Sequence, residues 1–103
     1  MTIEDRRQQV INAIAQGDLG DADAICLDGF EATGDAEFLF LQAVVKTEQQ
    51  AFGDAVALFE RAAEALAGRA DVAYGLGVAL QGLADTKAAV AAWQRAAALD
   101  PGH

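Results

Sequence analysis

Apolar and polar positions recur along this chain with the period of a helix. Ile3, Val10, Ile11 and Ile14 are spaced as one helical face requires, and Thr2 precedes them as a candidate cap. The same pattern returns five more times. It predicts further helices over residues 18–34, from residue 35 to at least 45, and over 52–67, 72–83 and 86–99.

Glycines and aspartates separate these stretches. Gly17, Gly34 and Gly68 follow apolar stretches, where a helix commonly ends. We expect the aspartates that precede helices to act as caps, namely Asp18, Asp35, Asp71 and Asp85. Because the turns between the helices are short, neighbouring helices should run antiparallel.

Two segments of the chain are nearly identical at an offset of 34 residues. Residues 55–63 (AVALFERAA) and 89–97 (AVAAWQRAA) agree at seven of nine positions if Phe is allowed for Trp. A weaker copy, residues 21–26, lies 33 residues before 54–59. The offset predicts three units, 2–34, 35–69 and 70–103, within a single domain that spans residues 1–103.

The third unit resembles the tetratricopeptide repeat. It carries Ala73-x2-Leu76-Gly77-x2-Leu80, then Ala89-x3-Trp93-x2-Ala96, then Pro101, at the spacing of that family. The family's Trp and Tyr positions hold Ala73 and Leu80 here. The second unit matches less completely, and the first is degenerate. The resemblance implies an all-α fold, a right-handed superhelix of three antiparallel helix-turn-helix repeats.

Members of this family bind peptides or helices on a concave face made by the first helix of each repeat. Transferred position by position, the resemblance assigns that face to Arg7, Ile11, Phe40, Val44, Thr47, Tyr74, Val78 and Gln81. The alternative is that Phe40 or Val44 belongs to the core. Only Arg7 would contribute positive charge, so an acidic C-terminal tail, which the family's carboxylate clamp grips, is not the expected ligand.

The last helix leaves an apolar stripe of Ala88, Ala92 and Leu99 where a further repeat would dock. Either the chain is a piece of a longer protein, or this face pairs with another molecule, for example as a two-fold homodimer. An alanine-rich surface that simply faces water is the third possibility.

Composition narrows the function classes. The 103 residues carry 16 acidic and 7 basic side chains, a formal charge of −9, which argues against nucleic acid or an anionic membrane as partner. The chain has no Ser, one Cys and one His, His103, so a Ser/His or Cys/His nucleophile pair is not expected. No targeting or membrane-spanning segment is found in the sequence, which indicates a cytoplasmic protein with Cys26 reduced.

Neither a metal nor a cofactor is expected. Asp18, Asp21 and Asp23 lack the order and the glycine of an EF-hand loop. The Gly75-Leu76-Gly77 segment lacks the third glycine of a dinucleotide fingerprint, and packing between helices explains Gly77 better. Gly75 and Gly82 should weaken their helix relative to alanine.

The sequence therefore predicts a protein-protein interaction module without enzymatic activity, which binds a partner helix or apolar segment in its groove or self-associates. The alternative is a regulatory or targeting domain of a larger enzyme whose catalytic part lies outside these 103 residues.

Overall fold

The computed structural model describes residues 1–101, and His103 lies outside them. This part of the chain forms six helices and no strand. In chain order they are α1 (Ile3–Ala15), α2 (Leu19–Thr33), α3 (Glu37–Glu48), α4 (Phe52–Ala65), α5 (Ala70–Gly82) and α6 (Thr86–Leu99).

Two of the expected caps form as the sequence predicts. The Thr2 side chain accepts a hydrogen bond from the Asp5 amide at 3.0 Å, and the Asp5 carboxylate accepts one from the Thr2 amide at 3.2 Å. Asp85 accepts from the Ala88 amide at 3.2 Å. These contacts span only three residues, so local sequence is enough to specify them.

The other aspartates differ from the prediction. Asp71 does not cap α5, because that helix begins at Ala70, two residues earlier than predicted, and has Arg69 at its N-cap position. Asp18 occupies the N-cap position of α2 without a side-chain cap hydrogen bond. Asp35 lies one residue before the N-cap of α3, where its carboxylate still accepts from the Glu37 amide at 2.9 Å.

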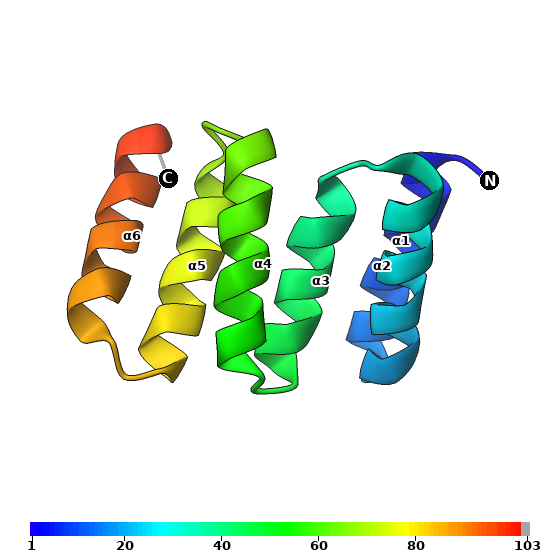
Figure 1. Ribbon diagram of the computed structural model, residues 1–103, viewed down its shortest axis with the longest axis horizontal. Coiled ribbons are helices and arrows are strands. Elements are labelled where there is room, and N and C mark those ends of the chain that lie inside the picture. The colour runs from blue at the N-terminus through cyan, green and yellow to red at the C-terminus, as the bar shows by residue number, and fades with distance from the viewer. Residues whose placement is uncertain (102–103) are drawn as a thin grey trace.

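The helices form three hairpins that stand side by side in a row (Figure 1). α1 pairs with α2, α3 with α4 and α5 with α6, and each new hairpin packs its first helix against the one before. The array is elongated, 39 Å by 25 Å by 22 Å. The predicted fold class, an all-α superhelix of tetratricopeptide-like hairpins, is confirmed.

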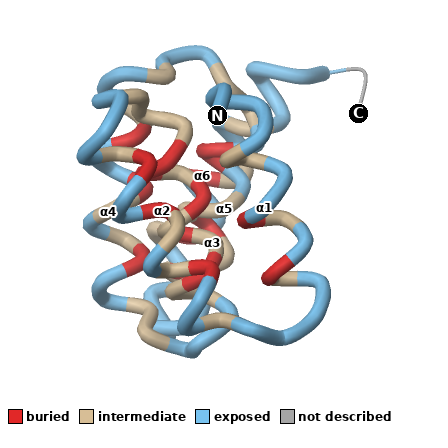
Figure 2. The backbone as a smooth tube through the Cα atoms, turned by 90° about the vertical axis from the view of Figure 1, so that its right-hand side faces the viewer, coloured by how far each residue is buried: buried red, intermediate tan, exposed pale blue. Residues whose placement is uncertain are grey.

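The core is divided between the two junctions of the array. Phe38, Val10 and Cys26 lie in the cluster between the first and second hairpins, whereas Phe59 and Val72 lie in the cluster between the second and third. In Figure 2 the buried positions are short segments of the helices, separated by half-buried and exposed turns. Cys26 is fully buried, and this burial, reinforced by the charge of Asp23, raises the pKa of the thiol to about 12. The thiol is therefore a core side chain and a poor nucleophile.

Three glycines of α5 make room for aromatic rings. A Cβ at position 75 would lie 2.5 Å from Cε1 of Phe59, and one at position 77 would collide with the indole of Trp93. Gly82 does the same for Phe52. The packing role predicted for Gly77 is confirmed. At Gly75 and Gly82 the lower helix propensity is accompanied by close packing of aromatic rings against the helix backbone.

The indole Nε1 of Trp93 is buried and has no hydrogen-bond partner. It is the only such side-chain nitrogen or oxygen among the described residues. A buried donor left unpaired lowers stability by about 1–3 kcal/mol. We therefore expect Trp93→Phe, which removes the donor and keeps a ring, to change the free energy of unfolding by less than about 1 kcal/mol, whereas Trp93→Ala should cost about 3–5 kcal/mol. Urea unfolding of both variants tests this, and an equally large loss in Trp93→Phe would show that the nitrogen is satisfied.

Candidate functional site: a concavity between α3 and α5

Side chains of α3 and α5 enclose an open concavity of about 290 Å³ on one side of the array. We call it the α3–α5 concavity. Five of the eight residues predicted for the inner groove line it, namely Phe40, Val44, Thr47, Tyr74 and Val78. Residues Glu48, Phe59, Asp71 and Gly75 complete the lining. The structure therefore brings together predicted residues that lie more than 30 positions apart in the sequence.

The floor of the concavity is aromatic and fixed by the core. Phe59 is 1% exposed, and its ring centroid lies 6.0 Å from that of Phe40 at an interplanar angle of 59°. Phe40 and Val44 are half-buried, so each contributes to the core and to the concavity at once. Tyr74 differs, because 60% of it is exposed. It is the largest apolar surface that the concavity offers to a partner.

The remaining three predicted residues lie elsewhere. Arg7 is held in an ion pair with Glu37, Ile11 is half-buried on α1, and Gln81 is exposed near the end of α5. None of the three lines the α3–α5 concavity. The first hairpin therefore does not line the concavity. It contributes only the charge of Arg7, which pairs with Glu37.

A chain of alternating charges connects the three hairpins. Arg7 Nε lies 3.1 Å from Glu37 Oε1, and Arg69 Nη1 lies 2.7 Å from Glu37 Oε2. Arg69 also grips Asp71 through two contacts, Nη2–Oδ2 at 2.7 Å and Nε–Oδ1 at 2.9 Å. The order Arg7–Glu37–Arg69–Asp71 runs from α1 to α5 and stabilises the relative placement of the helices that form the concavity.

Arg69 was missed by the sequence reasoning, which assigned positive charge to Arg7 alone. Its guanidinium carbon lies 5.4 Å from the centre of the Phe40 ring, so it stacks on an aromatic side chain of the concavity while it pairs with the carboxylates. The pKa of Arg69 is raised by its hydrogen bonds to Asp71 and Glu37. The acids Glu37 and Asp71, 34 residues apart, were a sequence signal that a cation could lie between them.

The carboxylates of Glu37 and Asp71 in this series of charges have lowered pKa values. Burial alone would raise the pKa of Glu37, but hydrogen bonds from Arg69 and Arg7 outweigh it and hold the pKa below its usual value of 4.5. The Arg69 hydrogen bonds also lower the pKa of Asp71 from 3.8, against the smaller opposing effect of burial. Both groups therefore bind protons more weakly in the folded than in the unfolded protein.

This difference predicts acid sensitivity. The stabilisation from Glu37 is complete above about pH 4.5, where the carboxylate is ionised even in the unfolded chain, and is lost as the pH falls through its lower folded pKa. We expect the free energy of unfolding of Glu37→Gln to decline less between pH 5 and pH 3 than that of the unaltered protein, with urea unfolding as the measurement. Parallel declines would contradict the linkage.

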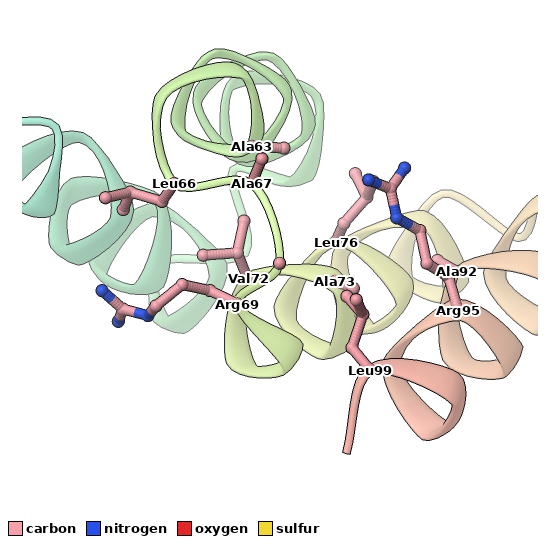
Figure 3. A pocket seen from close by; sticks show the side chains of 11 residues that line it. Ala63, Leu66, Ala67, Arg69, Val72, Ala73, Leu76, Ala92, Arg95 and Leu99 are labelled. Atoms are coloured by element: carbon pink, nitrogen blue, oxygen red, sulfur yellow. The ribbon is translucent and has the colours of Figure 1, made fainter. Parts of the chain in front are cut away.

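The apolar stripe predicted on the last helix lies in a different place. Ala92 is 9% exposed, and with Leu99 it lines a small crevice whose other walls include Ala63 and Leu66 at the end of α4 and Ala73 and Leu76 of α5 (Figure 3). Ala88, one turn before Ala92, is half-buried. Ala92 and Leu99 thus line a surface shared with α5 and the end of α4, whereas the sequence predicted that the stripe faces the open end of the array.

Within residues 1–101 no group of three or more His, Cys, Asp or Glu side chains is placed to hold a metal ion. No helix in this range is long and apolar enough to cross a bilayer. What the α3–α5 concavity presents is apolar surface together with the carboxylates of Glu48 and Asp71.

The fold is shared with a solved protein. No protein-family model matches the sequence, and no curated protein does so either. Among solved structures, MamA (residues 41 to the end) from Desulfovibrio magneticus RS-1 superposes with a TM-score of 0.86 at 21% sequence identity. The match covers 99% of this chain and 58% of that chain, so this chain spans little more than half the length of its structural neighbour. The likeness establishes a tetratricopeptide-like helical-repeat fold.

Proposed function

We propose that this chain is a cytoplasmic protein-interaction module without catalytic activity, built from repeat units 2–34, 35–69 and 70–103. The α3–α5 concavity is its binding site, and the ligand is a helix or apolar segment of another protein. The observation that carries the proposal is the meeting of Phe40, Val44, Tyr74 and Val78 in one open concavity. Because a monomer that exposes clustered apolar side chains tends to bind there, this surface is the natural place for a partner.

The charges around the concavity narrow the kind of partner. Glu48 and Asp71 line it, and the neighbouring cation, Arg69, is already held by Glu37 and Asp71. An acidic segment would therefore meet carboxylates, whereas an apolar segment flanked by Lys or Arg would meet complementary charge. We propose the latter class of ligand.

The proposal predicts the effect of removing the exposed aromatic ring. With a partner isolated on the immobilised protein, Tyr74→Ala should weaken binding by at least about tenfold, because aromatic side chains at the centre of a contact surface carry much of the binding energy. Isothermal titration calorimetry measures the change. Tyr74 is 60% exposed, so its loss should leave the fold intact, which circular dichroism checks.

Leu83→Ala provides the matched control. Leu83 is 51% exposed and does not line the concavity, so this variant should bind as the unaltered protein does. Unchanged affinity in Tyr74→Ala, or an equal loss in both variants, would overturn the assignment of the site.

A further inference from the structure

The third hairpin carries a second cavity, of about 510 Å³, on α5 and α6. We call it the end face and define it by six of its lining residues, which are Asp71, Tyr74, Trp93, Ala96, Ala97 and Asp100. Its lining residues all belong to the third hairpin, whose α6 is the last helix of the row in Figure 1. The interaction at the α3–α5 concavity does not use Trp93, Ala96 or Ala97.

The end face repeats a surface that is covered elsewhere in the molecule. Subtracting 34 from five of its positions gives residues around which α5 docks, namely Glu37, Phe40, Phe59, Ala62 and Ala63. There α5 buries Val72 and Ala79 against α3 and α4. The end face therefore corresponds, residue by residue, to the surface on which α5 packs, and no other described residues cover it.

The surface under α5 shows which residues a helix needs in order to dock there. Arg69, at the N-cap of α5, reaches back to the Glu37 carboxylate at 2.7 Å. Gly75 lies against the Phe59 ring, with no room for a side chain between them. The equivalents on the end face are Asp71 for Glu37 and Trp93 for Phe59. A fitting helix therefore carries a basic residue before its first turn and Gly six residues later.

Charge selects among the possible occupants. Asp71 is the last member of the charge series Arg7–Glu37–Arg69–Asp71. Its side chain pairs with Arg69 but is still 51% exposed, so a basic residue of a docked helix can pair with it as Arg69 pairs with Glu37. Asp100 lies at the same cavity. A second copy of this chain fits poorly, since the exposed side chains of its α1 include Glu4 and Asp5 and its net charge is −9.

We propose that the end face is the docking site for an amphipathic helix of another polypeptide. This helix has Lys or Arg at its N-terminal end opposite Asp71, an aliphatic residue over Ala96, and Gly over Trp93. It docks as α5 docks on the preceding hairpin. The site shares Asp71 and Tyr74 with the lining of the α3–α5 concavity and extends from them to α6.

Trp93 is the only tryptophan of the chain and reports directly on this site. The probe is a copy of residues 68–84 appended directly after Pro101, so that the appended helix keeps the 34-residue register. A tether of this kind gives an effective concentration in the millimolar range, so even weak docking is seen. We expect a blue shift of Trp93 emission, weaker acrylamide quenching and a Tm several degrees higher.

Matched probes separate docking from mere chain extension. Arg69→Glu or Gly75→Leu in the appended copy should abolish the shift, because the first puts an acid on Asp71 and the second puts a side chain on the indole. Ala97→Arg in the protein should block docking, whereas Ala98→Arg, exposed one position further along α6, should not. Equal Trp93 signals from the three probes, or none from the native one, would overturn the proposal.

Light scattering on the unaltered protein tests the competing occupant. We expect a monomer with Trp93 open to acrylamide. A dimer in which Trp93 is protected, and which Ala97→Arg dissociates, would mean that a second copy covers the end face and would equally overturn the proposal.

Discussion

Phe59→Ala should lower the free energy of unfolding by about 3–5 kcal/mol, a large part of the stability of a protein this small. Phe59 is 1% exposed and belongs to the cluster between the second and third hairpins, so its removal leaves a cavity at the junction that orients α5 against α3 and α4. Urea unfolding followed by circular dichroism measures the loss.

Leu27→Ala is the control for this substitution. Leu27 is 46% exposed on α2, and truncating it should change the free energy of unfolding by about 0.5 kcal/mol or less. A loss below about 1 kcal/mol in Phe59→Ala would contradict the assignment of Phe59 to a tightly packed core.

Gly75→Leu should destabilise the protein by about 1–3 kcal/mol, because the new side chain would have to occupy the space of the Phe59 ring. Gly53→Ala is the matched control, since a Cβ there meets nothing within 4 Å. This control should leave stability unchanged or raise it by about 0.5–1 kcal/mol, the difference between glycine and alanine inside a helix.

The two substitutions should compensate one another. In Phe59→Ala with Gly75→Leu, the leucine enters the space that the ring has vacated, as Leu41 and Cys26 share the core of the preceding junction. We expect the double variant to be more stable than the sum of the single losses by at least about 1 kcal/mol. Strict additivity would show that the two residues do not pack against each other.

Local features of the sequence predicted local structure. The capping box of Thr2 and Asp5, the Asp85 cap and the bounds of α6 all follow from residues a few positions apart. The 34-residue offset then placed Phe40 beside Tyr74, because stacked units put equivalent residues on neighbouring helices.

Two features escaped prediction for different physical reasons. The partner of Arg69 is Glu37, 32 residues away, and no local pattern specifies a contact of that length. Alanine occupies half of the positions of α6, on all sides of the helix. The difference in hydrophobicity between its faces is therefore too small to show which face packs against α5. Ala92 was consequently assigned to the wrong face, and the end face around Trp93, Ala96 and Ala97 was not recognised as a cavity.

Site-specific photocrosslinking in cells tests the interaction proposal most directly. A benzophenone side chain placed at Thr47 lines the α3–α5 concavity and not the end face, and one placed at Ala57, exposed on α4, lines neither. We expect discrete crosslinked products from position 47 that position 57 does not give. Products identical at both positions, or none at either, would contradict a partner bound between α3 and α5.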